Sequence, residues 1–236
     1  MTENINIVLD AGTTWSKIAE KNSSSLMKNY QEYFIKENNG YKYYILPSSN
    51  LKNFNFKFDK ATGHMSLSML KDKKDYENEI IALIQGFRKQ IKEDSIILDM
   101  GSRDSKWVKF NDGKFKDLDW NNSCSSSTGA TIEMLLKFYN IKAEDLKFQT
   151  EKYVITCGIF GLEKIMDDIA NGSEAKIAVS KFIHGIAFNA WNFAKKPNKI
   201  YLSGGFCSNQ CFVDSLNQYC DVIPLGRFLL TDGLIK

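Results

Sequence analysis

A nine-residue pattern occurs twice in this chain and constrains the fold more than any other feature of the sequence. Residues 9–17 read LDAGTTWSK and residues 98–106 read LDMGSRDSK, with five identical positions and one Thr/Ser exchange. Each copy follows an apolar run typical of a β-strand, residues 5–9 and 96–98. The pattern predicts a strand, a tight turn with an Asp and small residues, and a returning strand. Two unrelated hairpins with glycine turns could share this pattern by chance, but an internal duplication explains the aligned identical positions better.

A third glycine-rich segment lies near the C-terminus. Residues 200–206 read IYLSGGF, an apolar run that opens into small residues. A glycine pair allows close approach of a ligand to the backbone, and the start of a following helix offers N–H groups to an anion. The sequence contains neither G-x-x-x-x-G-K-S/T nor G-x-G-x-x-G, so phosphate would have to be bound in another way than by a Walker or Rossmann loop.

The two Asp-x-Gly hairpins could bind phosphates by facing each other across a cleft. Their carboxylates, Asp10 and Asp99, would hold Mg²⁺ directly or through its waters, because this hard cation prefers oxygen ligands. The donors predicted to face phosphate are Gly12, Thr13 and Thr14 in one hairpin and Gly101, Ser102 and Arg103 in the other.

Composition narrows the class of protein. The 236 residues are 43% hydrophobic and 25% charged, values typical of a globular chain. A net charge of +3 is too small to indicate nucleic acid or an anionic membrane as the main partner. The N-terminus lacks the basic and apolar start of a signal peptide, so we expect a cytoplasmic protein without a membrane segment. Five cysteines, an odd number, make disulfides unexpected there and leave metal or redox chemistry open.

Strands and helices alternate in both halves of the chain. Helical spacing of apolar residues predicts helices over 76–91, 128–139, 160–170 and 174–193, and strands are expected within 28–46 and over 54–58. The pattern predicts an α/β protein of two similar lobes, residues 1–92 and 93–236.

Several other residues favour a structural role. Cys207 and Cys211, four residues apart, are expected to share a helix face in the core, with a metal site as the less favoured alternative. His184 lies in an apolar run and is expected to be a hydrogen-bonded core histidine rather than a catalytic base. Trp107 and Trp120 are expected in the core rather than in an electron relay.

The ordered set of motifs resembles the actin, hexokinase and Hsp70 ATPase superfamily. More narrowly, it resembles the ATP-dependent activators of 2-hydroxyacyl-CoA dehydratases and the related benzoyl-CoA reductase ATPase subunits. The resemblance rests, in the family's order, on LDAGTTWSK, ATG (61–63), LDMGSRDSK, NNSCSSSTG (121–129), TCGIFG (156–161) and SGGFCSN (203–209). It implies two RNase H-like lobes with a nucleotide cleft between them, the second lobe carrying the cluster cysteines and the adenosine loop.

In that family, each subunit of a homodimer gives two cysteines to one bridging [4Fe–4S] cluster. Cys124 and Cys157 stand at the matching positions. Without the resemblance, two cysteines 33 residues apart would favour a buried structural role. Each precedes a predicted helix, whose N-terminal N–H groups would stabilise a thiolate and an anionic cluster.

The resemblance also implies the remaining site residues. Catalysis is assigned to Asp10, Asp99, Arg103 and Asp104. Further nucleotide contacts are assigned to Lys17, Thr128, Gly129, Gly204, Gly205 and Asn209, beside the hairpin donors named above. Arg103 is a departure, since the family has there a Gln that could orient the attacking water, so the rate of hydrolysis is open.

These expectations describe an ATPase that drives electron transfer. A flavodoxin or ferredoxin would reduce the shared cluster, and ATP, bound with Mg²⁺ and cleaved to ADP, would drive a low-potential electron to a client iron–sulfur dehydratase or reductase. Two other classes stay open: a small-molecule kinase of the same superfamily, and a nucleotide-gated binding or assembly protein that lacks a cluster. Iron content separates the first class from both.

Overall fold

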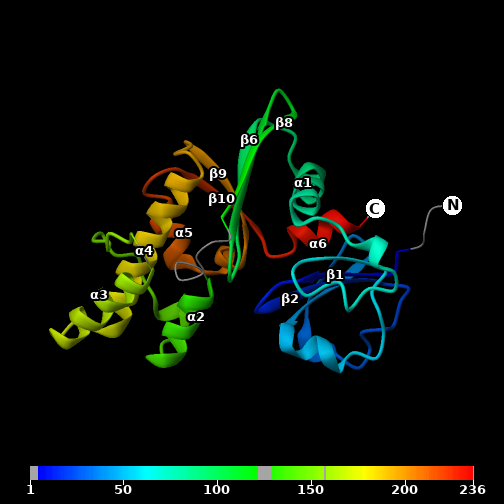
Figure 1. Ribbon diagram of the computed structural model, residues 1–236, viewed down its shortest axis with the longest axis horizontal. Coiled ribbons are helices and arrows are strands. Elements are labelled where there is room, and N and C mark those ends of the chain that lie inside the picture. Colours follow the sequence, from blue (N-terminus) through cyan, green and yellow to red (C-terminus); the bar gives the residue numbers. More distant parts are fainter. Residues whose placement is uncertain (1–4, 122–128, 157, 236) are drawn as a thin grey trace. The chain divides into compact units, whose positions relative to one another are not determined.

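The chain folds into two compact units. The computed structural model describes residues 5–121, 129–156 and 158–235. One unit comprises Met1–Lys92 together with Arg227–Lys236, and the other comprises Glu93–Gly226 (Figure 1). Each contains its own five-stranded sheet and its own apolar core.

The sheet of the first unit has the order β3-β4-β2-β1-β5. β1 pairs antiparallel with β2 and parallel with β5, so the first Asp-x-Gly hairpin occupies the centre of this sheet. The residues of β1 alternate between the two faces, and Ile7, Leu9 and Ala11 pack into the unit's core. The strands are β1 Ile7–Ala11, β2 Trp15–Lys21, β3 Phe34–Asn38, β4 Tyr41–Pro47 and β5 Lys60–Thr62.

Two helices complete the first unit, although they lie far apart in the sequence. α1 (Glu79–Gln90) begins where the Asn78 side chain accepts a hydrogen bond from the Ile80 N–H. α6 (Leu229–Leu234) contacts β1, β2 and β5, and α1 packs against α6. The Tyr43 hydroxyl donates to Asp232 at 2.8 Å, which ties α6 to β4.

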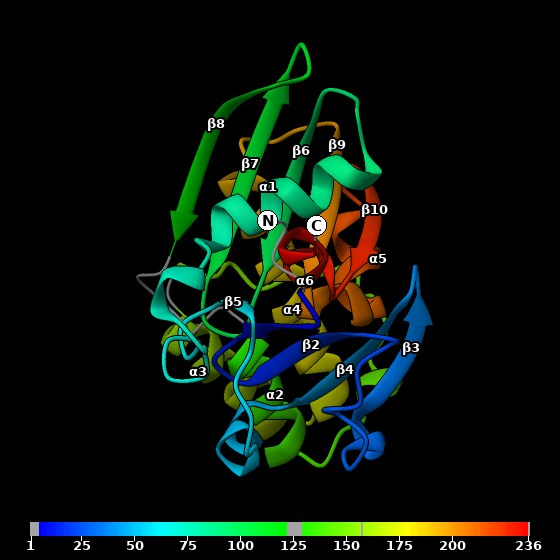
Figure 2. The ribbon, with the colours of Figure 1, turned by 90° about the vertical axis from the view of Figure 1, so that its right-hand side faces the viewer.

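The sheet of the second unit has the order β10-β9-β6-β7-β8, visible as neighbouring ribbons in Figure 2. β6 pairs antiparallel with β7 and parallel with β9, the same arrangement that β1 has with β2 and β5. The second Asp-x-Gly hairpin therefore also lies at the centre of its sheet. The strands are β6 Ser95–Met100, β7 Ser105–Asn111, β8 Lys114–Asn121, β9 Lys199–Gly204 and β10 Asp221–Gly226.

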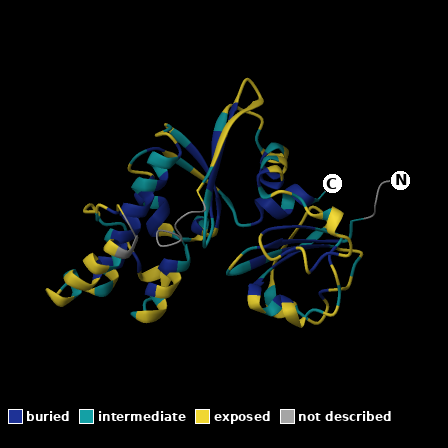
Figure 3. Cartoon of the chain, viewed as in Figure 1, coloured by how far each residue is buried: buried dark blue, intermediate teal, exposed yellow. Residues whose placement is uncertain are grey.

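Four helices accompany this second sheet: α2 Gly129–Phe138, α3 Gly158–Ala170, α4 Ala175–Phe193 and α5 Gln210–Leu216. The core joins Leu98 and Leu202 of the sheet to Phe182 of α4 and Phe212 of α5. Figure 3 shows the central strands as buried and the outer faces of α2 and α3 as exposed. None of the described helices is long and apolar enough to cross a membrane.

Two segments of the first unit differ from the sequence predictions: residues 54–58 and, at the chain end, residues 227–236. Residues 227–236, expected in the second lobe, pack with the first unit, because α6 and α1 approach each other at glycines. Residues 54–58 form no strand beyond a single bridge from Phe58 to Leu70. Phe54, Phe56 and Phe58 instead pack against one another, with ring centroids 5.0 to 6.2 Å apart.

The α1–α6 contact yields a stability prediction. A Cβ on Gly86 would lie 1.9 Å from the Leu229 carbonyl oxygen, so a methyl group cannot fit without displacing α6. Gly→Ala inside a helix normally stabilises by about 1 kcal/mol. Here Gly86→Ala should instead lower the free energy of unfolding by about 1–3 kcal/mol, measured by urea denaturation. Gln85→Ala, at an exposed position of the same helix, is the control, and a stabilised Gly86→Ala variant would contradict the α1–α6 packing.

Candidate functional site: two Asp–Lys hairpins

Each predicted hairpin presents an aspartate and a lysine as a cross-strand pair. Asp10 stands opposite Lys17 in the β1–β2 register, and Asp99 stands opposite Lys106 in the β6–β7 register. The Lys17 ammonium lies 3.0 Å from Asp10 Oδ2, and the Lys106 ammonium lies 3.5 Å from Asp99 Oδ2. Both aspartates are only 5% exposed, so their charges need these partners.

A third strand extends the repeat beyond the nine-residue pattern. Asp10 stands beside Thr62 of β5, and Asp99 stands beside Ser203 of β9. A glycine with φ of +93° follows each of these hydroxyl residues, namely Gly63 and Gly204. A Cβ on Gly63 would lie 2.5 Å from the Ala11 carbonyl oxygen, and a Cβ on Gly204 would lie 2.4 Å from the Met100 carbonyl oxygen. In each unit, this carbonyl belongs to the residue that follows the aspartate. Both units thus end the Asp strand against a glycine that no other residue can replace without strain.

The turn of the first hairpin rests on Ser48, a residue that the sequence analysis missed. The Ser48 hydroxyl donates to the Gly12 carbonyl at 2.6 Å, and its N–H donates to the Thr14 carbonyl at 2.8 Å. Ser48 itself is buried, whereas Thr13 is exposed at the tip of the turn. These bonds hold the turn carbonyls inward, so the predicted donor face of the turn stays available to a ligand.

In the second unit, the predicted binding residues converge on the hairpin turn. The N–H of Gly129, at the start of α2, donates to the Gly101 carbonyl at 3.2 Å, and the Ala130 N–H donates to the Ser102 carbonyl at 3.0 Å. Open space surrounds the position of a Cβ on Gly205, which is exposed. The structure therefore brings the second hairpin, the start of α2 and the glycine pair into one region of this unit.

The two hairpins differ in how their lysine is paired. Lys17 neutralises Asp10 alone, whereas Lys106 is shared between Asp99 and Asp104, at 3.5 Å from each. The second hairpin thus carries one more carboxylate than the first. Asp99 Oδ1 and Ser203 Oγ are buried and have no hydrogen-bond partner among the described residues. A carboxylate oxygen without a donor suits a hard cation such as Mg²⁺.

The other predicted residues fall into three groups. Arg103 lies half-buried in the second turn, and the Asn209 side chain accepts the Phe212 N–H at 2.9 Å, which caps α5. Thr128, Cys124 and Cys157 lie outside the described residues.

The remaining cysteines have structural surroundings. Cys211 packs in the core, and burial raises the pKa of its thiol. Burial likewise raises the pKa of Cys220 to about 11, which disfavours the thiolate that a metal would need. Cys207 precedes α5 in a short 3-10 turn, so it does not share a helix with Cys211 as expected. Among the described residues, no group of three His, Cys, Asp or Glu side chains could hold a metal ion.

His184 and Trp107 have the structural roles expected of them. His184 is 3% exposed, its Nδ1 donates to the Gln149 carbonyl at 2.8 Å, and its Nε2 accepts from the Tyr219 hydroxyl at 2.8 Å. Burial lowers the pKa of this imidazole, so it stays neutral at pH 7. Trp107 is 1% exposed and packs in the core of the second unit.

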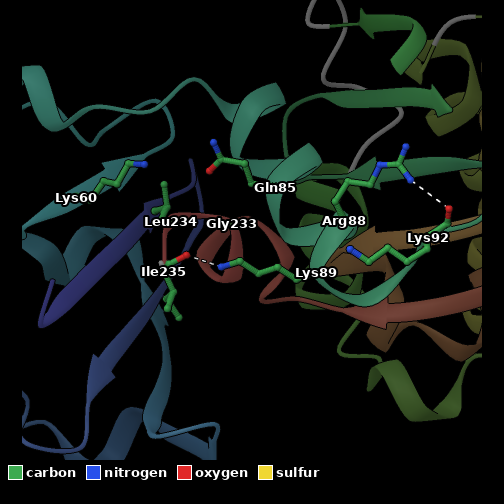
Figure 4. Close-up of a pocket in the computed structure, with 8 residues that line it drawn as sticks. All are labelled: Lys60, Gln85, Arg88, Lys89, Lys92, Gly233, Leu234 and Ile235. Atoms are coloured by element: carbon green, nitrogen blue, oxygen red, sulfur yellow. Dashed lines mark hydrogen bonds between the residues drawn. The ribbon is translucent and has the colours of Figure 1, made fainter. Parts of the chain in front are cut away.

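A basic cavity of about 520 Å³ lies in the first unit, apart from the hairpin (Figure 4). Two of its cations have internal partners: Lys60 pairs with Glu77 at 2.9 Å, and Lys89 donates to the carbonyls of Asp232 and Ile235. Burial lowers the pKa of Lys89. The contacts of Lys89 hold the end of the chain against α1.

The two sheets, each with a central Asp–Lys hairpin, define an actin/hexokinase/Hsp70-type ATPase fold. Solved structures of this type confirm the predicted fold class. The activator of 2-hydroxyisocaproyl-CoA dehydratase from Clostridium difficile, with bound ADPNP, superposes with a TM-score of 0.72 at 17% identity, over 98% of this chain and 91% of that one. Component A of (R)-2-hydroxyglutaryl-CoA dehydratase from Acidaminococcus fermentans gives 0.68 at 16% identity, over 97% and 94%.

The predicted resemblance to dehydratase activators is also confirmed in sequence. The (R)-2-hydroxyglutaryl-CoA dehydratase activating ATPase of Acidaminococcus fermentans is 23% identical over 177 residues, which is 70% of this chain and 67% of that protein. A 2-dehydro-3-deoxygalactonokinase-like protein from Sinorhizobium meliloti shares the fold more distantly, with a TM-score of 0.52 at 10% identity. No family model matches the chain.

The difference in ion pairing between the hairpins can be tested by removing each lysine. Lys106→Met leaves Asp99 and Asp104 facing each other without a cation, and should cost roughly 3–5 kcal/mol of unfolding free energy. Lys17→Met leaves one unpaired carboxylate and should cost less. In the Lys106→Met variant, adding Asp99→Asn should restore more than half of the lost free energy of unfolding. Urea denaturation measures all three, and equal losses for the two lysines would contradict the difference in ion pairing.

Proposed function

We propose that this chain is an ATP-dependent activator that delivers a low-potential electron to a partner iron–sulfur enzyme. The observation that carries the proposal is the repeated Asp–Lys hairpin at the centre of each sheet of an ATPase fold, together with the similarity in sequence to a dehydratase-activating ATPase. Nucleotide binding and electron transfer would use different residues of the chain.

The nucleotide would be bound by both hairpins. The turn donors of Gly12, Thr13 and Thr14 would contact one phosphate and those of Gly101 and Ser102 another, while the open side of Gly205 would accommodate the adenosine. Backbone N–H groups and hydroxyls in tight turns bind anions without a full charge of their own.

Magnesium fits the second hairpin better than the first. Asp99 Oδ1 has no hydrogen-bond partner among the described residues. Each hairpin would nevertheless place one carboxylate, Asp10 or Asp99, within reach of the water ligands of the ion. When bound, Mg²⁺ would neutralise phosphoryl charge during transfer. Lys106 and Lys17 would keep the two carboxylates oriented, and Arg103 would stabilise phosphoryl charge instead of orienting water.

The electron would be carried by a [4Fe–4S] cluster that two chains share. Cys124 and Cys157 would supply two ligands per chain, so a homodimer would complete the four that a cube requires. The helices that follow them in the sequence, α2 and α3, expose Phe138 and Phe160, which supports an interface there. A flavodoxin or ferredoxin would supply the electron, and a 2-hydroxyacyl-CoA dehydratase-type reductase would receive it.

The free energy of ATP is sufficient for this role. For a one-electron couple, about 59 mV corresponds to roughly 1.4 kcal/mol, so about 5 kcal/mol of coupling shifts a potential by about 200 mV. Partner binding must differ between nucleotide states, since a ligand without differential affinity shifts no equilibrium. A small-molecule kinase is the alternative that a structural neighbour favours, and it would contain no iron.

The phosphate-site assignment predicts loss of ATP hydrolysis when either aspartate is replaced. Asp10→Asn and Asp99→Asn should each lower kcat for Mg²⁺-dependent hydrolysis by roughly 10²–10³-fold, since each removes a group that acts on transferring charge. Asp117→Asn is the control, because Asp117 is exposed on β8 and its side chain accepts a hydrogen bond from the adjacent Leu118 N–H. Steady-state turnover measures the effect, and unchanged turnover in both variants would remove the assignment.

The shared cluster predicts a stoichiometry. Protein purified without oxygen should contain about four irons per dimer. Cys124→Ser and Cys157→Ser should each remove the iron and weaken dimerisation while nucleotide binding persists, whereas Cys220→Ser should keep the iron. Iron analysis combined with light scattering decides, and four irons on a monomer would falsify the bridging site.

A further inference from the structure

Trp120 joins the second hairpin through a short hydrogen bond. Its indole Nε1–H donates to Asp104 Oδ2 at 2.6 Å, and the same oxygen lies 3.5 Å from the Lys106 ammonium. The Lys106 ammonium also lies over the Trp120 ring, 5.2 Å from its centroid. One tryptophan therefore contacts both Asp104 and Lys106, and Lys106 in turn contacts Asp99.

This arrangement has no equivalent in the first hairpin. The repeat places Trp15 where the second copy has Asp104, so no second carboxylate competes for Lys17. In the neighbouring strand, Ile45 stands opposite Lys17, whereas Trp120 stands opposite Lys106. The second hairpin has thus gained a carboxylate and the indole donor that binds it, as one set.

The indole donor binds one of the two carboxylates that share Lys106. Asp104 Oδ2 receives a charge-assisted bond from Trp120 that is shorter than its contact with Lys106. Because the indole satisfies this oxygen, Lys106 can stay equally far, at 3.5 Å, from Asp99 and Asp104. Without the indole N–H, the Lys106 ammonium would move toward Asp104. Asp99 would then lose the contact with Lys106 that holds its position.

We propose that Trp120 is a positioning residue for the phosphate site: it holds Asp104, and through Asp104 the shared Lys106, so that Asp99 faces the cation of the bound nucleotide in one geometry. This inference rests on the proposed nucleotide site. It assigns to Trp120 a role that differs from the core packing that the sequence predicted, and Trp120 is only half-buried.

The test replaces the indole and compares it with a matched tryptophan. Trp120→Phe keeps a ring beside Lys106 but removes the N–H. Trp191→Phe is the control, because the Trp191 indole donates to the Pro197 carbonyl at 3.0 Å in the same unit and has no part in the site. Trp120→Phe should lower kcat for Mg²⁺·ATP hydrolysis roughly tenfold and change KM less than about threefold, whereas Trp191→Phe should change neither more than about twofold.

The indole N–H signals provide a second readout without turnover. The chain has four tryptophans, so a ¹⁵N-resolved spectrum contains four indole signals, and the one missing in Trp120→Phe is assigned to Trp120. That signal should move in Asp104→Asn, and again when Mg²⁺ and ADP are added to the wild type, while the Trp191 signal stays in place. A role in folding alone would not produce the response to nucleotide.

The outcomes separate this inference from the proposed function. A wild-type protein that hydrolyses ATP while Trp120→Phe matches Trp191→Phe in kcat overturns the positioning role alone. So does a Trp120 signal that ignores both Asp104→Asn and Mg²⁺·ADP. A wild-type protein that binds no nucleotide contradicts the proposed function, and the positioning role falls with it.

Discussion

The cross-strand pair of a buried aspartate and a lysine is the interaction on which both units depend. A carboxylate that is 5% exposed at the centre of a sheet is costly unless a cation lies opposite, and Lys17 and Lys106 occupy those positions. The pairs fix the register of the two hairpins, because a slip by one residue would bury each charge without its partner. The turn of each hairpin therefore begins where the Asp strand, β1 or β6, ends.

The two pairs have diverged in a way that suits different tasks. The first is a closed one-to-one pair whose turn is held by Ser48. The second shares one ammonium between two carboxylates, with Trp120 as an additional donor and Asp99 Oδ1 unpartnered among the described residues. The lysine of the first pair serves one carboxylate, and the lysine of the second serves two. This difference supports a cation at the second hairpin and phosphate contacts at both.

Much of this arrangement could be predicted because the repeat is local in sequence. Strand, turn and returning strand lie within nine residues, so the hairpins follow from the pattern alone. The Asp–Lys pairs were not predicted and come from the strand register of the structure. Contacts between distant segments could not be predicted in this way. Ser48 and Trp120 reach the turns through β-strand pairing, and α6 returns to the first unit through a glycine contact with α1. From the sequence alone, only the Thr-Gly and Ser-Gly pairs that end at Gly63 and Gly204 could have shown that the repeat includes a third strand.

The central proposal is that both hairpins contact nucleotide phosphates, and hydrogen–deuterium exchange tests it most directly. Amide exchange would be followed with and without Mg²⁺ and a non-hydrolysable ATP analogue. The account predicts that residues 10–16 and 99–105 become protected together, at the same nucleotide concentration, while the α1–α6 contact in the first unit is unchanged. Protection of one hairpin alone, or of neither at saturating nucleotide, would contradict it.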